Sequence, residues 1–173
     1  MQTAILTDPD ASREAGATAA LGAGNPLLAD WSSPFGLPPF DRPTLWSERN
    51  PPGSSQFTAY RDLAADPPAL VVQVGATQLR YHARCVDDLH AMLRAHGDWL
   101  PLGGADEQKP AANGTVEAWA RASTNPVGGW YGLKKGLRGR FAVYVPPVLE
   151  ALGLAEVEHA PRNNRMRALA RPR

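Results

Sequence analysis

The sequence has 173 residues, of which 43% are hydrophobic and 20% are charged, enough for one folded domain with a hydrophobic core. It contains one cysteine, no run of 18 apolar residues and no amino-terminal signal peptide, which argues against an internal disulfide bond, a membrane span and secretion. We therefore expect a cytoplasmic protein that forms a small single domain of the α+β class.

The formal net charge is +1, but the charges are unevenly distributed. Residues 1–118 contain 8 basic and 14 acidic side chains, whereas residues 119–173 contain 10 basic and 3 acidic side chains. The two parts therefore carry formal net charges of −6 and +7. Such a split predicts that the two parts contact each other or that the basic part binds an anionic partner.

Residues 1–55 contain eight prolines and show no sustained period of two or 3.6 residues. Because proline lacks a backbone N–H and interrupts regular hydrogen bonding, we expect a disordered, proline-rich arm. The folded domain is expected over residues 56–170, with residues 171–173 as a basic tail.

The first regular elements are a hairpin and a helix. Residues 69–74 and 78–81 are apolar runs separated by a glycine-containing loop, a pattern that predicts a β-hairpin. Residues 85–96 place apolar side chains at helical spacing, at Val86, Leu89, Met92 and Leu93. Gly97 follows where a helix C-cap is expected, so the pattern predicts a helix over 85–96. Its solvent side would carry Asp87, Asp88 and Arg94.

The remaining elements are shorter. Residues 115–121 are too few to decide firmly between a strand and a helix, and Val116 and Trp119 fit neither period clearly; of the two, we favour a strand. Two consecutive prolines are expected to begin a short helix at residues 146–152, since proline suits the first turn of a helix but not its interior. Residues 154–159 and 165–169 are expected to pair as a second hairpin.

No residue is singled out as catalytic. A zinc hydrolase of the H-E-x-x-H type needs two histidines one helical turn apart, and this motif is absent. The nearest group of ligand-type residues is His82, Cys85, His90 and His96. Cys85 and His90 would lie about 140° apart around the predicted helix, so we expect no metal and no cofactor. Cys85 is expected to be a small buried residue.

The segment VLEALGLAEVEHAPRNNRMRAL resembles the end of many bacterial winged-helix regulators, in which an apolar helix is followed by a strand, an arginine-rich tip and a second strand. The resemblance implies that Leu149, Leu152 and Leu154 face the core. It implies a wing tip formed by Arg162, Asn163, Asn164 and Arg165. Guanidinium and amide groups at such a tip suit contacts with phosphates or with the minor groove.

Two further resemblances cover other parts of the chain. The pieces DPPAL, DDLH, GDWLPLG, ADEQKP, GTVEAW, NPVGGWYGLKKG, RGRF and RNNRMRA resemble an uncharacterised bacterial domain family over about residues 57–168, which implies a shared fold and no particular activity. The segment from Asn25 to Arg42 resembles the start of metallopeptidases of the thimet oligopeptidase and peptidyl-dipeptidase family. Since the zinc motif of those enzymes is absent, no peptidase activity is expected.

The leading interpretation is a non-enzymatic binding module with a basic C-terminal face, and its most natural partner is DNA or RNA. Aromatic rings among the basic side chains could stack on unpaired bases. The candidate contacts are Trp130, Tyr131, Lys134, Lys135, Arg138, Arg140, Phe141, Arg162, Asn163, Asn164 and Arg165. One alternative is an enzyme or enzyme accessory with a pocket between Asp98 and Tyr131, and another is a protein-interaction domain.

Overall fold

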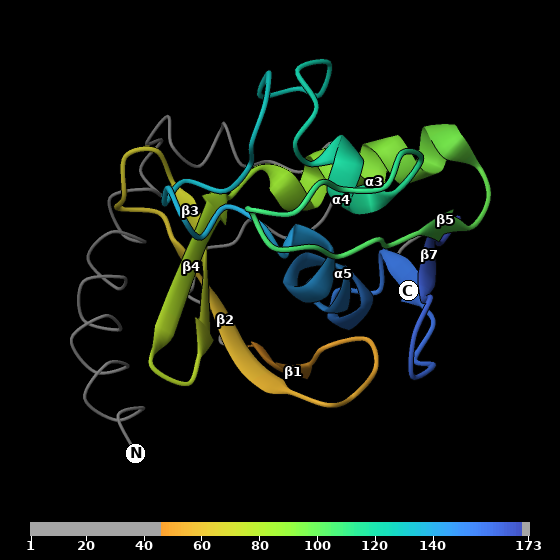
Figure 1. The fold of residues 1–173 in the computed structure, drawn as a ribbon, viewed down its shortest axis with the longest axis horizontal. Coiled ribbons are helices and arrows are strands. Elements are labelled where there is room, and N and C mark those ends of the chain that lie inside the picture. Colours follow the sequence, from red (N-terminus) through yellow and green to blue (C-terminus); the bar gives the residue numbers. More distant parts are fainter. Residues whose placement is uncertain (1–45, 171–173) are drawn as a thin grey trace, which may run out of the picture. The chain divides into compact units, whose positions relative to one another are not determined.

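The computed structural model of this chain describes residues 46–170, which form an α+β domain with two antiparallel sheets (Figure 1). The larger sheet has the order β1-β2-β3-β4, and the smaller has the order β5-β7-β6. The strands are β1 (Trp46–Arg49), β2 (Gln56–Asp62), β3 (Ala69–Val74), β4 (Thr77–His82), β5 (Leu100–Pro101), β6 (Ala155–Val157) and β7 (Arg165–Ala168). The helices are α3 (Cys85–His96), α4 (Val116–Trp119) and α5 (Phe141–Ala151).

The core forms where α5 packs against one face of the larger sheet, and α3 and α4 also contact α5 (Figure 1). Alternation along a strand places every second side chain on this face. Phe57 of β2 meets Tyr144 edge-on with ring centroids 5.1 Å apart, and Tyr81 of β4 meets Phe141 at 5.6 Å. Edge-to-face pairs of this kind add to the stabilisation from apolar burial.

The predictions for residues 69–97 are confirmed. The first hairpin consists of β3 and β4, and α3 has the predicted bounds. Gly97 has a φ of 76°, and its N–H bonds to the carbonyl oxygen of Leu93, which is the expected helix end. One detail is different: Asp88 is not turned freely to solvent, because it accepts hydrogen bonds from Arg84 and from the Tyr131 hydroxyl.

The larger sheet begins ten residues before the predicted domain boundary at residue 56. Strand β1 pairs with β2, and Trp46 is buried opposite Ala59. The prolines that predicted an irregular arm here, at positions 51 and 52, lie in the turn between these strands rather than inside either one. The rest of the predicted arm lies outside the described residues, as does the segment from Asn25 to Arg42.

The strand predicted at residues 115–121 is wrong, because this segment contains the short helix α4. Thr115 has extended backbone angles, and its hydroxyl accepts a hydrogen bond from the N–H of Ala118 at 3.2 Å. This is the N-cap arrangement that begins a helix. The cap residue, rather than the apolar spacing, carried the relevant signal.

The helix predicted at 146–152 begins five residues earlier, so Pro146 and Pro147 lie inside α5. Proline in a helix interior costs about 3 kcal/mol, through its missing hydrogen bond and a clash with the preceding turn. Eight of the eleven residues of α5 are buried, including both prolines. Burial of large apolar side chains contributes about 1.5–3 kcal/mol each, which offsets the loss.

The second predicted hairpin is confirmed, with shorter strands β6 and β7, and β5 pairs with the other edge of β7. Leu149 and Leu154 are fully buried, as the resemblance implied, whereas Leu152 is half-buried. Within residues 46–170, no helix combines the length and apolar character needed to cross a membrane.

Candidate functional site

The tip of the β6–β7 hairpin is held by one buried side chain. Asn164 accepts a hydrogen bond from the N–H of Ala160 at 2.7 Å and donates one to the carbonyl oxygen of the same residue at 2.9 Å. Asn163 has a left-handed backbone with a φ of 58°, which asparagine tolerates better than most residues. Arg162 and Asn163 are therefore exposed on a tip of defined shape.

The strands below this tip carry paired charges. Arg165 contacts Glu158 at 2.6 Å, and Arg167 contacts Glu156 at 2.8 Å across the two strands. The guanidinium of each arginine also lies over the ring of Trp99, at 5.2 and 4.5 Å from its centroid. Arg165 is thus already engaged, whereas no ion pair involves Arg162 within the described part of the chain.

Two candidate arginines of the basic segment are bound to acidic residues from the other half of the sequence. Arg138 contacts Glu107 through its guanidinium at 2.6 Å, and its backbone N–H donates to the same carboxylate at 2.8 Å. Arg140 forms an ion pair with Asp106 through Nε. These hydrogen bonds lower the pKa of Glu107 and of Asp106. Part of the charge asymmetry is therefore satisfied inside the domain.

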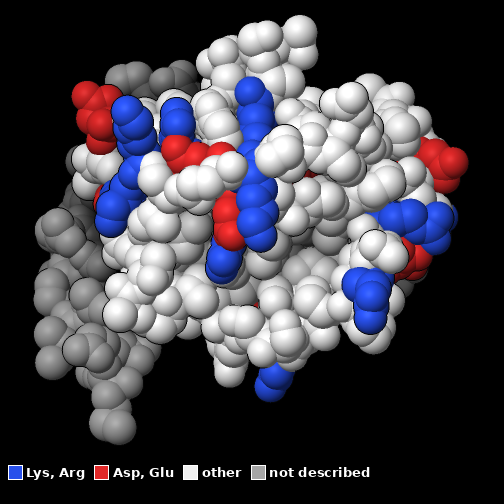
Figure 2. Space-filling model, in the orientation of Figure 1, with Lys and Arg blue, Asp and Glu red and all other residues white. Residues whose placement is uncertain are grey.

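The two lysines of this segment are different. Lys134 and Lys135 are exposed, and neither makes an ion pair with any residue between 46 and 170. Figure 2 shows the basic side chains of one face in separate groups, with acidic side chains among them. The cations on this face do not form one continuous basic patch.

The aromatic candidates do not provide exposed rings for stacking. Tyr131 and Phe141 are buried in the core, which corrects the expectation that they stack on bases. Trp130 is half-buried between two guanidinium groups, those of Arg121 and Arg138, each 4.6 Å from its ring centroid. The sequence showed that these rings are close to basic residues along the chain, but it could not indicate whether each ring points into the core or towards solvent.

A buried ion pair that the sequence analysis missed joins α4 to α5. Glu117 has no exposed surface and accepts hydrogen bonds from Arg121 at 2.8 Å and from the N–H of Ala142 at 2.8 Å. Burial raises the pKa of Glu117, and the hydrogen bond from Ala142 followed by that from Arg121 opposes this effect. The i, i+4 spacing of these two residues was the available signal.

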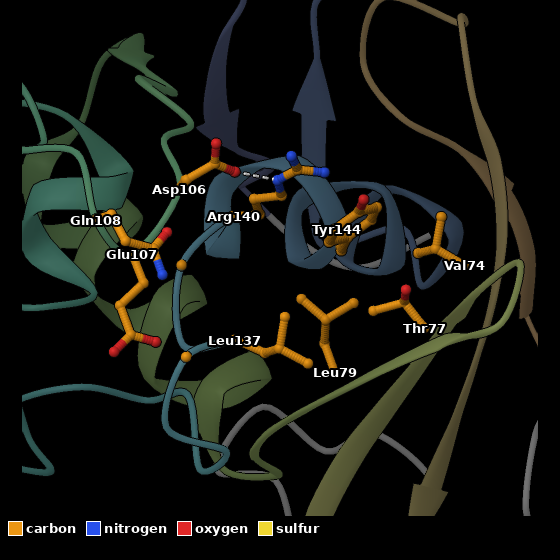
Figure 3. A pocket seen from close by; sticks show the side chains of 11 residues that line it. Val74, Thr77, Leu79, Asp106, Glu107, Gln108, Leu137, Arg140 and Tyr144 are labelled. Atoms are coloured by element: carbon orange, nitrogen blue, oxygen red, sulfur yellow. Dashed lines mark hydrogen bonds and ion pairs between the residues drawn. The ribbon is translucent and has the colours of Figure 1, made fainter.

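A hollow of about 370 Å³ lies between the β3–β4 hairpin and the start of α5 (Figure 3). Only three of its residues, at positions 106–108, come from the stretch between Asp98 and Tyr131 that was considered for a pocket. The hollow is lined by Val74, Thr77, Leu79, Asp106, Glu107, Gln108, Gly136, Leu137, Gly139, Arg140 and Tyr144.

Cys85 is buried at the start of α3, and burial raises the pKa of its thiol. A thiol in this state is a poor nucleophile and a poor metal ligand. Among residues 46–170, no three His, Cys, Asp or Glu side chains are grouped closely enough to hold a metal ion.

Comparison with families of related sequences matches residues 41–169 to a family of unknown function, DUF6855. The match includes the whole described domain except its last residue. Separate comparisons with curated proteins and with solved structures find no match. The resemblance of the segment from Asn25 to Arg42 to oligopeptidases is therefore not supported.

Proposed function

We propose, from the premise that this chain belongs to the family of unknown function DUF6855, that it is a non-enzymatic binding module that contacts nucleic acid. The contacts would come from exposed cations that have no carboxylate partner within residues 46–170. The observation that carries the proposal is the hairpin tip. Arg162 and Asn163 are exposed there, while the side chain of Asn164 holds the tip in shape. A rigid tip loses less conformational entropy when it binds.

Two neighbouring lysines, Lys134 and Lys135, would supply a second contact with the nucleic acid. Lys134 and Lys135 are exposed and have no carboxylate partner within the described residues, so a phosphate would not have to displace an acidic side chain. At Arg138 and Arg165 the phosphate would have to compete with a carboxylate that already binds both Nε and an Nη group, and at Arg140 it would meet Asp106, which binds Nε. The proposed contact set is therefore Lys134, Lys135, Arg162 and Asn163.

The resemblance to winged-helix regulators supports a role for the hairpin but not for the helix before it. Helix α5 is followed by a β-hairpin with an exposed basic tip, as the resemblance implies. A helix that reads the major groove presents polar side chains to base edges. Of the α5 side chains, only Val143, Glu150 and Ala151 are not buried. We therefore propose contacts to phosphates, with little dependence on base sequence.

The test is fluorescence anisotropy of the full chain with labelled single-stranded and duplex DNA. Binding should weaken steeply between about 50 and 200 mM salt, because phosphate contacts release counterions. Arg162→Gln and the double variant Lys134→Gln with Lys135→Gln should each weaken binding and reduce the salt dependence. Arg49→Gln is the matched control, since it removes one exposed positive charge from β1, outside the proposed contact set.

Equal losses of DNA affinity in Arg162→Gln and Arg49→Gln would contradict a specific role of the hairpin tip, because binding would then depend only on the net charge of the protein. Absence of binding to both DNA forms at about 50 mM salt would refute the proposal, and the basic half would then serve contacts with the acidic half or with another protein. A strong preference for one base sequence would contradict the assignment of the contacts to phosphates.

A further inference from the structure

We propose that the hollow beside α5 is a binding site for a small organic carboxylate that carries an apolar group. The hollow shares no residue with the proposed nucleic-acid contacts, so this inference is independent of that proposal. Its size lies within the range of small-molecule pockets, which is about 300–1,000 Å³. Figure 3 shows apolar side chains along one side of the hollow and charged side chains along the other.

The apolar side is formed mainly by the end of the β3–β4 hairpin next to its turn. Val74 and Thr77 form the last pair of the β3–β4 ladder, and Leu79 lies on the same face of β4, two residues along. Val74 and Leu137 are only half-buried, so their side chains leave apolar surface exposed in the hollow. Covering that surface with the apolar part of a ligand would contribute favourably at about 25 cal/mol per Å².

The polar side of the hollow contains the guanidinium of Arg140, which donates only some of its possible hydrogen bonds to carboxylates. Arg140 donates from Nε to Asp106, and within residues 46–170 neither of its Nη groups donates a hydrogen bond to a carboxylate. The hydroxyl of Tyr144 lies beside the same guanidinium and adds a polar group to this side of the hollow. The two Nη groups form the fork that binds the two oxygens of a carboxylate in parallel.

The charges around the hollow favour a monoanion over a phosphate. Asp106 and Glu107 line it, and each is paired with one arginine, so the rim is close to neutral before a ligand binds. A dianionic phosphate would meet two carboxylates with a single incompletely paired guanidinium to compensate. A carboxylate brings one negative charge, which that guanidinium can balance.

The wall that carries Arg140 is fixed by close backbone packing. A Cβ atom at Gly139 would lie 2.3 Å from the backbone nitrogen of Glu107, so only glycine allows the two segments to approach this closely. The N–H of Arg140 donates to the carbonyl oxygen of Ala105 at 2.8 Å, which ties the same segments together. The polar side is thus held in place before a ligand arrives, which reduces the entropy cost of binding.

The probe is 3-phenylpropionate, added to the ¹⁵N-labelled full chain and followed by amide shifts in NMR spectra. We expect saturable shifts at backbone amides around the hollow, such as those of Leu79, Leu137 and Tyr144. The neutral 3-phenylpropanamide, which has the same shape, should bind at least about tenfold more weakly, as expected for the loss of a charged hydrogen bond. An acetylated tripeptide ending in a free leucine carboxylate tests whether the ligand is a peptide end or a free acid.

Two variants of the rim test the role of Arg140. Arg140→Gln should weaken binding of 3-phenylpropionate at least about tenfold. Asp106→Asn should leave it unchanged or strengthen it, because it removes the competing carboxylate and keeps the guanidinium. Arg80→Gln is the control: it removes a positive charge from β4, where strand alternation places the side chain on the face opposite to Leu79. This control should bind like the unmodified chain.

Equal affinity for the acid and the amide would overturn the assignment of a carboxylate ligand, and so would undiminished binding by Arg140→Gln. Absence of saturable shifts with the acid and with the peptide would overturn the site itself. If Arg140→Gln fails to fold, the comparison of acid with amide and the Asp106→Asn variant still decide the question.

Discussion

Glu117 and Arg121 form an ion pair, one turn apart, that connects three segments of the domain. The carboxylate of Glu117 caps the start of α5 through the N–H of Ala142. The guanidinium of Arg121 donates to the carbonyl oxygens of Ala105 at 2.6 Å and of Lys109 at 2.7 Å. The pair therefore positions both the loop and the helix that form the polar side of the hollow.

Removing Arg121 alone should destabilise the domain strongly. Arg121→Met would leave the carboxylate of Glu117 buried without its cation, which typically costs about 3–5 kcal/mol. The double variant Glu117→Gln with Arg121→Met should be less destabilised than Arg121→Met, because no unpaired charge remains. Urea denaturation followed by circular dichroism measures both. Additive losses in the double variant would contradict the coupling between the two residues.

Acid pH should destabilise the domain in part through Glu107. The hydrogen bond from Arg138 lowers the pKa of Glu107 in the folded state. Such a group contributes stability above its unfolded pKa, 4.5 for glutamate, and this contribution is lost as the pH falls through the folded pKa. Glu107→Gln should therefore flatten the decline of the free energy of unfolding below about pH 4.5.

Glu117 should have the opposite effect to Glu107 on the free energy of unfolding at acid pH. Burial raises its pKa in the folded state, so its contribution to stability is present at low pH and is lost as the pH rises through that folded value. Glu117→Gln should make the acid decline steeper rather than flatter. A flatter decline in this variant would mean that its pKa is lowered on folding.

Strand β1 should contribute to stability although its sequence suggested an irregular arm. Trp46 is buried opposite Ala59, and His159 lies between the carbonyl oxygen of Pro51, at 3.0 Å, and the carboxylate of Glu150, at 2.8 Å. Trp46→Ala should cost about 3–5 kcal/mol, the usual effect of truncating a buried aromatic residue. Thermal unfolding measures this, with the exposed Ser47→Ala as control; equal melting temperatures would show that β1 is dispensable.

The thiol of Cys85 should be inert in the folded protein. Burial raises its pKa, so the reactive thiolate is scarce, and the side chain has no exposed surface. Iodoacetamide should leave the native chain unmodified and should label it fully in urea, as measured by mass spectrometry. Labelling of the native chain at the rate of a free thiol would contradict the burial of this residue.

Elements encoded by neighbouring residues could be predicted from the sequence. Helix α3 has an apolar face and a glycine at its end, and the β3–β4 hairpin has two apolar runs around a short loop. Each pattern specifies a local structure without reference to the rest of the chain. The hairpin tip at Arg162 was predictable for the same reason, because its turn lies between two short strands that pair with each other.

What the sequence could not determine depends on contacts between distant segments. Pro146 and Pro147 are tolerated inside α5 because the sheet and α3 bury that helix, and only the tertiary structure supplies this burial. The ion pairs of Arg138 and Arg140 join residues more than thirty positions apart in the chain. Sequence alone determined which side chains are charged, whereas the fold decided which of those charges are already neutralised and which remain available to a ligand.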